Sequence, residues 1–254
     1  MLIRRYIGFF LLAAVLAGCA QVNSPEKNKI QQADAHYKLA SAHLQANNPT
    51  LALKELLIAV DLDSENSAIQ VALAQAYQQK KAFSLAERHY LKALELSDDD
   101  PRYQNNLATL YLDMQEWDKA IVYFDKAASN LLFLQPYVAI AGKAYAYYKK
   151  QDYSQALTYY KEVTNLAPGY APAYYLQSEV YRAMGEREME RTLLETTIDR
   201  SPQFLQARYR LAELYIEGGA YDDARQELKT ILEVAPASEL GLQAKSKLKT
   251  IADK

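Results

Sequence analysis

The amino-acid sequence predicts an all-α protein, a solenoid of six helix pairs that ends in a capping helix. The main observation is a ladder of small residues with steps of 34, 34, 36, 34 and 34 residues. An aromatic residue or histidine follows each small residue after three positions, and an alanine follows after twelve in five of the six repeats. The small residues are Ala40, Ala74, Ala108, Ala144, Ser178 and Ala212. A fixed period of this length is typical of stacked helical repeats.

The ladder resembles the tetratricopeptide repeat, most clearly in the third repeat with Leu107-Ala108, Tyr111, Ala120 and Phe124. The resemblance implies two antiparallel helices per repeat and a right-handed superhelix. The fifth repeat is the poorest copy, because Glu190 stands where the pattern has alanine. The predicted repeats cover residues 33–66, 67–100, 101–134, 137–170, 171–204 and 205–238.

Composition argues against nucleic acid as a partner. The 254 residues are 50% hydrophobic, enough for a continuous core, and the formal net charge is −2. A protein that binds phosphates needs a basic stripe, which this chain lacks. The 21 tyrosines, against 6 phenylalanines and 1 tryptophan, suit half-buried positions because each ring has an apolar body and a polar tip.

Residues 1–18 are expected to form a signal peptide, with a charged start at Arg4 and Arg5 and an apolar stretch too short to remain as a membrane span. The tetrapeptide Leu16-Ala17-Gly18-Cys19 resembles a bacterial lipobox. That resemblance implies cleavage before Cys19 and acylation of its thiol and amino group; the alternative is an ordinary secretory signal with a chance cysteine. Since Ala20 follows the cysteine, the resemblance further implies sorting to the outer membrane, facing the periplasm.

The prediction places a polar tether at residues 19–32 and a capping helix at residues 239–254, where a polar outer face would cover the last apolar surface of the stack. Asp98-Asp99-Asp100-Pro101 joins the second and third repeats. A calcium loop is the alternative reading, but the central glycine and terminal glutamate are missing, and Asp100 suits a helix N-cap. The apolar residues 129–137 lengthen the next junction by two; packing is favoured over an exposed binding patch.

No motif indicates an enzyme. His36, His43 and His89 lack the spacing of a shared metal site, and the sequence has no HExxH, Walker-type loop or Gly-x-Ser-x-Gly. Cys19 is the only cysteine. We therefore expect no catalytic residue, metal, cofactor or small-molecule substrate.

A protein partner is the remaining expectation. In tetratricopeptide repeats the first helix of each pair lines the concave side, with exposed positions at −3, +1 and +4 from the small residue. The alternative is that these aromatic residues pack only against each other. Extended or helical segments are the ligands that such a surface suits. The residues predicted for this groove are Tyr37, Asn105, Thr109, Tyr145, Tyr148, Tyr175, Tyr209 and Glu213.

The lipobox, the tether, the six repeats and the final helix together resemble the PilF/PilW family of type IV pilus biogenesis lipoproteins, or pilotins. Asn105-Asn106 before Leu107 and the long junction before Pro136 are similar to that family, while Ala108 departs from its usual glycine. The resemblance implies binding of outer-membrane secretin subunits and promotion of their multimerisation. Two alternatives stay open: an adaptor that docks peptidoglycan hydrolases or proteases, and a scaffold for polysaccharide export or a surface complex.

Overall fold

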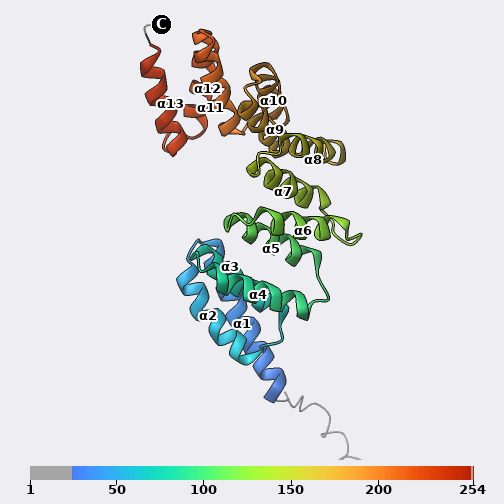
Figure 1. The fold of residues 1–254 in the computed structure, drawn as a ribbon. Helices are drawn as coiled ribbons and strands as arrows, with labels where there is room; N and C mark the ends of the chain where they lie inside the picture. The colour runs from blue at the N-terminus through green and yellow to red at the C-terminus, as the bar shows by residue number, and fades with distance from the viewer. Residues whose placement is uncertain (1–24, 253) are drawn as a thin grey trace, which may run out of the picture. The chain divides into compact units, whose positions relative to one another are not determined.

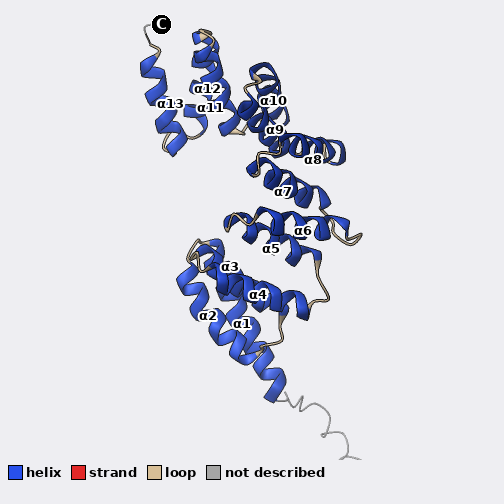
Figure 2. Ribbon diagram, in the orientation of Figure 1, coloured by secondary structure: helices blue, strands red, loops and turns tan. Residues whose placement is uncertain are grey.

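The computed structural model describes residues 25–252 and 254, and these are organised as helices joined by short loops (Figures 1 and 2). Six helix pairs are followed by a single helix, which confirms the predicted all-α class and the six pairs with a terminal helix. The helices are α1 (Pro25–Gln45), α2 (Pro49–Leu62), α3 (Ser67–Gln79), α4 (Phe83–Leu96), α5 (Pro101–Asp113), α6 (Trp117–Ser129), α7 (Pro136–Lys149), α8 (Tyr153–Leu166), α9 (Ala171–Met184), α10 (Arg187–Arg200), α11 (Leu205–Glu217), α12 (Tyr221–Val234) and α13 (Glu239–Thr250).

The turn inside each pair has the same backbone geometry. One residue, seven positions after the small residue of the ladder, has a positive φ. The amide that follows it donates to the carbonyl of the aromatic position, as Asp152 does to Tyr147 over 3.0 Å. This is the hydrogen bond that closes a helix end through a left-handed residue. The residues with positive φ are Asn47, Lys81, Gln115, Gln151, Gly185 and Gly219.

Small and large buried residues alternate along the repeats. All six small residues of the ladder are fully buried, which lets the two helices of a pair approach closely. Sixteen positions later each repeat has one large side chain that is at most 2% exposed. These large residues are Leu56, Tyr90, Phe124, Tyr160, Leu194 and Leu228.

Polar pairs 19 residues apart join the two helices in three of the repeats. His36 Nδ1 lies 2.7 Å from Glu55, and His89 Nδ1 lies 2.7 Å from the Gln70 side chain. In the sixth repeat Arg208 and Glu227 are 2.6 Å apart. Two of the three histidines therefore belong to contacts between helices.

The chain divides into two compact units, Met1–His89 and Tyr90–Lys254. In the first, Leu56, Ile69 and Leu73 are central to a core formed by α1, α2 and α3. In the second, α13 packs beside α12 and buries Ala244 and Ile251 with Leu228 (Figure 1). The last helix therefore covers an apolar surface of the sixth pair, as expected of a capping helix.

One boundary and the packing of one junction differ from the prediction. Helix α1 begins at Pro25, eight residues earlier than expected, so residues 25–32 are helical instead of part of a tether. Proline suits the first turn of a helix, and Ala33 anchors this extension by packing in the core. The 129–137 junction does not pack as favoured: Leu131, Leu132 and Leu134 are exposed, because the loop between α6 and α7 directs them away from both helices.

One further expectation is confirmed, and others lie outside the described residues or stay predictions. Asp100 is the N-cap of α5 and accepts from the Arg102 amide, with Pro101 at the start of the helix, as predicted. The signal peptide, the lipobox and Cys19 lie outside the described residues. The right-handed superhelix stays a prediction.

Candidate functional surface

Tyrosines on α7 begin the candidate surface. Tyr145 and Tyr148 lie one turn apart, with ring centroids separated by 6.1 Å, and both are half-buried. Tyr148 also approaches Tyr153 of α8, at 6.2 Å between centroids, and Lys149 lies over the Tyr145 ring at 5.7 Å. The two predicted tyrosines therefore form an aromatic pair that is partly open to solvent, a kind of surface that binds through ring contacts and hydroxyl hydrogen bonds.

The next part of the surface is on α9. The Tyr175 ring packs against Phe204 with centroids 5.0 Å apart, and burial raises the pKa of both Tyr175 and Tyr148. Glu179 pairs with Arg182 over 3.1 Å. Glu179 acts electrostatically on both tyrosines, which links the α7 and α9 parts of the surface.

A buried ion pair between Glu190 and Arg210 joins α10 to α11 next to this surface. Glu190 of α10 is 1% exposed, and Arg210 of α11 places its Nε 2.6 Å from the Glu190 carboxylate. Arg210 also reaches Glu213 and Glu217, at 3.3 Å each. Burial alone would lower the pKa of Arg210, but the hydrogen bond and charge of Glu190, helped by its other two partners, raise it above its ordinary value.

The surface continues to the last helix. Lys247 of α13 lies 3.3 Å from Glu213 and 5.9 Å from the centroid of the Tyr209 ring. Lys247 is 34 residues after Glu213, so α13 continues the ladder in the manner of a first helix. Tyr209 packs on the core that α13 helps to close.

The other predicted residues are placed differently. Thr109 is exposed, but its hydroxyl donates to the Asn105 carbonyl 3.0 Å away and so is used within α5. The Asn105 side chain is partly buried, and its Oδ1 has no hydrogen-bond partner among the described residues. Tyr37 packs on the core of α1, α2 and α3, in the first unit. The structure therefore links Tyr145, Tyr148, Tyr175, Tyr209 and Glu213 through neighbouring helices of the second unit.

Sequence reasoning missed Glu190, Arg210 and Lys247 as parts of this surface. A signal existed: a glutamate at a position that is alanine in the other repeats must be buried, and a buried carboxylate needs a cation. Arg210 follows 20 residues later, on the next first helix. Arg182, Arg210 and Lys247 are therefore already paired with carboxylates, unlike the basic groups of a clamp for a free peptide carboxylate.

Glu179 makes the stability of this surface depend on pH. Burial is the largest influence and raises the pKa of Glu179, Arg182 opposes it, and Glu190 adds to it. A raised pKa means that the folded state holds its proton to a higher pH than the unfolded state, so stability falls as pH rises through the window between the two pKa values. We expect Glu179→Gln to raise Tm at pH 7 and to lose that advantage below the unfolded pKa, about 4.3. Thermal denaturation at both pH values checks this.

Glu188→Gln is the matched control, because the Glu188 side chain is 82% exposed on α10. It is expected to leave Tm almost unchanged at either pH. A Glu179→Gln variant that gains more stability at acid pH than at pH 7 would show that the ionised carboxylate is the favoured form.

The arrangement offers ring faces and fixed charges for recognition. Within the described part of the chain, no group of three or more His, Cys, Asp and Glu side chains is placed to hold a metal ion. None of the helices from residue 25 onward combines the length and apolar character needed to cross a bilayer. Rings, amides and fixed charges on consecutive helices can hold a peptide segment by contacts and hydrogen bonds.

Family models identify the repeats. Three models described as tetratricopeptide repeat match residues 37–101, then 101–130 with 139–170, and then 191–248. Together they match more than half of the chain. It is a tetratricopeptide-repeat protein. This family is typically a non-catalytic scaffold, and the repeat protein described here is a scaffold for protein–protein interaction.

Two segments of this tetratricopeptide-repeat protein lie between the ranges that the family models match. Residues 131–138 contain the lengthened junction, and residues 171–190 contain α9 and the start of α10. The second gap holds Tyr175, Glu179 and Glu190. The candidate surface thus includes the segment in which the general repeat pattern is weakest.

Proteins of type IV pilus assembly and biogenesis are similar to this chain. Type IV pilus assembly protein PilF of Pseudomonas aeruginosa is 26% identical over 129 residues, which are 49% of this chain and 51% of PilF. The matched segment thus spans about half the length of that relative. The crystal structure of PilW, a type IV pilus biogenesis factor, superposes with a TM-score of 0.70 at 19% identity, covering 83% of this chain and 97% of PilW. A structure of Pseudomonas aeruginosa PilF gives 0.67 at 18% identity, covering 87% and 100%.

Proposed function

We propose that this protein is a lipid-anchored scaffold that binds a secretin subunit of the type IV pilus and promotes its localisation and multimerisation in the outer membrane. The observation that carries the proposal is the sequence similarity to PilF. The shared fold with PilW and PilF is consistent with it. The function needs no bond chemistry: one surface binds the partner, and one lipidated residue holds the complex at the membrane.

The surface on α7, α9, α11 and α13 is the proposed partner-binding surface. Tyr145 and Tyr148 supply half-buried rings, and the Glu179–Arg182 pair lies beside them. Rings that are already packed lose little conformational freedom on binding, so their contacts contribute more to affinity. Fixed pairs of opposite charge favour a polar segment over a purely apolar one. An extended or helical segment of the secretin is the ligand that fits these features.

Cys19 is the proposed anchor. Several acyl chains on one residue give lasting attachment, because each buried methylene contributes about 0.8 kcal/mol. A partner held by a tethered scaffold has a high effective concentration near the membrane. Multimerisation is a concentration-dependent step, so tethering alone favours it.

The aromatic pair gives the direct binding test. We expect Tyr145→Ala with Tyr148→Ala to weaken binding of the purified periplasmic region of the secretin about 10-fold or more, which is roughly 1.4 kcal/mol. Helicity is expected to fall little, because both rings are only half-buried. Calorimetric titration and circular dichroism of the same samples check the two statements.

Tyr174→Ala is the matched control for that experiment. Tyr174 is also partly buried on α9, but its hydroxyl donates to the Pro168 carbonyl and its ring lies under Arg200, away from the aromatic pair. It is expected to bind like the wild type. An equal loss of helical signal and binding in the double variant would mean that Tyr145 and Tyr148 are core residues, and the proposed partner-binding surface would be wrong.

A further inference from the structure

The loop between α6 and α7 exposes apolar side chains to an unusual degree. Leu131, Leu132 and Leu134 are 100%, 83% and 93% exposed, more than any other large apolar residue of the described chain. Single exposed leucines are ordinary, but three within four residues form a patch. The repeat pattern does not require them, because they lie in the segment that lengthens the step from Ala108 to Ala144 to 36 residues. We call residues 130–135 the leucine loop.

Hydrogen bonds within the leucine loop stabilise its conformation. The Asn130 side chain accepts from the Leu132 amide over 2.9 Å, and the Asn130 carbonyl accepts from Phe133 over 3.0 Å. The Gln135 carbonyl accepts from the Val138 amide at the start of α7. A turn closed by an asparagine side chain is a defined local structure. The leucines are therefore presented by a structured loop.

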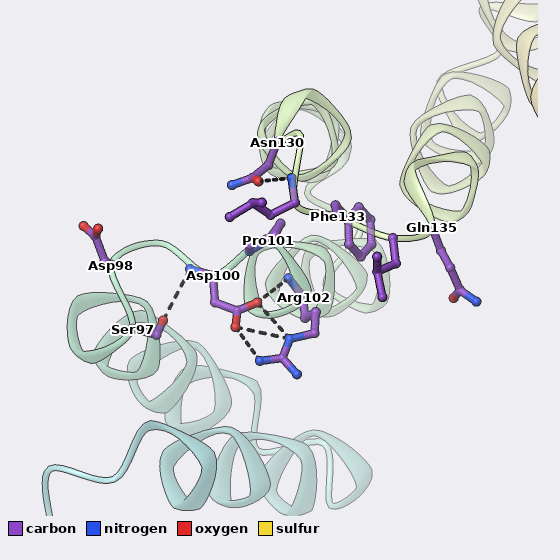
Figure 3. Close-up of a pocket in the computed structure, with 10 residues that line it drawn as sticks. Ser97, Asp98, Asp100, Pro101, Arg102, Asn130, Phe133 and Gln135 are labelled. Atoms are coloured by element: carbon purple, nitrogen blue, oxygen red, sulfur yellow. Dashed lines mark hydrogen bonds and ion pairs between the residues drawn. The ribbon is translucent and has the colours of Figure 1, made fainter.

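A pocket of about 670 Å³ lies beside the loop. Figure 3 shows Pro101 next to the Asp100–Arg102 pair, and Phe133 and Gln135 of the leucine loop on another side of the pocket. The α4–α5 connection supplies one wall, and the leucine loop supplies the other through Leu132 and Leu134. A volume of this size accommodates several side chains of a bound segment.

The charge at the rim of the pocket is negative. Arg102 is the one basic residue in the lining, and its guanidinium is already bound to Asp100, with Nη2 2.6 Å from the carboxylate. That hydrogen bond lowers the pKa of Asp100 and keeps it ionised. Asp98 also lines the pocket, is exposed, and forms no ion pair with any described residue. The rim thus has one carboxylate in excess, next to an apolar wall.

We propose that the leucine loop and this pocket are a second docking surface, for a partner protein segment that has apolar side chains next to a lysine or arginine. The apolar residues would cover Leu132 and Leu134, and the cation would lie near Asp98. A bilayer fits less well, because Asp98 at the rim would face anionic lipid headgroups. The surface is distinct from the aromatic pair, which lies about 14 to 18 Å further along α7 from Pro136 by the rise of an α-helix.

The test uses the whole mature chain and a short fluorescent peptide with two leucines flanked by lysines. Fluorescence anisotropy is expected to show at least about 10-fold weaker binding for Leu132→Ser with Leu134→Ser. Asp98→Asn is expected to weaken binding a few-fold and to reduce its salt dependence, since one ion pair is lost. A peptide with glutamates in place of the lysines is expected to bind more weakly than the lysine peptide.

The controls separate this surface from its alternatives. Leu242→Ser removes a leucine that is 60% exposed on α13 and is expected to bind the peptide like the wild type. The Tyr145 and Tyr148 variant is also expected to bind it normally, whatever becomes of secretin binding. Peptide binding that does not depend on Leu132 and Leu134 would overturn the proposal. So would leucine-dependent binding to vesicles of phosphatidylethanolamine and phosphatidylglycerol without leucine-dependent peptide binding, which would assign the loop to a membrane.

Discussion

Arg210→Leu is expected to lower the free energy of unfolding by about 3–5 kcal/mol, the cost of leaving a buried charge without its partner. The substitution introduces an apolar side chain and removes the only ion-pair partner that the Glu190 carboxylate has among the described residues; Glu190 is 1% exposed. The effect arises from the stranded charge more than from the lost attraction. Urea denaturation followed by circular dichroism measures it.

The second step of that experiment distinguishes this cause from a simple packing defect. Glu190→Ala restores the alanine of the other repeats, so Arg210→Leu in that background is expected to cost much less than it does alone. Arg191→Leu is the control, since Arg191 and Glu188 form an exposed pair worth at most about 1 kcal/mol. Equal effects of Arg210→Leu with and without Glu190 would contradict the buried-charge account.

Gly142→Ala is expected to destabilise the protein by about 1–3 kcal/mol, although alanine normally favours a helix over glycine by roughly 1 kcal/mol. A Cβ at Gly142 of α7 would overlap the ring of Phe124 from α6. Phe124 is 2% exposed and central to the third repeat, so its ring has little room to move. The clash therefore outweighs the gain in helix propensity. Thermal and urea denaturation both report the change.

A smaller partner is expected to relieve the clash. Gly142→Ala is predicted to cost less in a Phe124→Leu background than in the wild type, because leucine lacks the ring atoms that lie against Gly142. Gly169→Ala is the control: its Cβ would meet nothing within 4 Å. A stabilised Gly142→Ala protein would mean that Phe124 rotates away freely and that the contact between α6 and α7 is loose.

The repeat period predicts most of the fold because it follows from close packing. A position such as Ala144 must be small wherever two helices meet, and Tyr160 must be large wherever a core layer is filled. These needs recur in each repeat and so appear as a ladder in the sequence. The start of α1 at Pro25 was missed, because residues 25–32 are all exposed and the ladder has no residue there.

The candidate surface was predictable only in part. Helix spacing places Tyr145 and Tyr148 on one face, and the structure brings them together. The pairing of Arg210 with Glu190 spans two repeats, and a period found within repeats cannot reveal it. The prediction that the leucine loop packs was wrong for a related reason. An apolar junction is equally compatible with packing and with exposure until its hydrogen bonds are known.

The most direct test of the proposed function is the state of the pilus secretin in outer-membrane fractions of cells with and without this protein, measured as heat-resistant multimer on a gel. We expect the multimer to be lost without the protein, to return with the intact gene, and not to return with Cys19→Ala. An unchanged amount of multimer in cells that lack the protein would contradict the proposed secretin function.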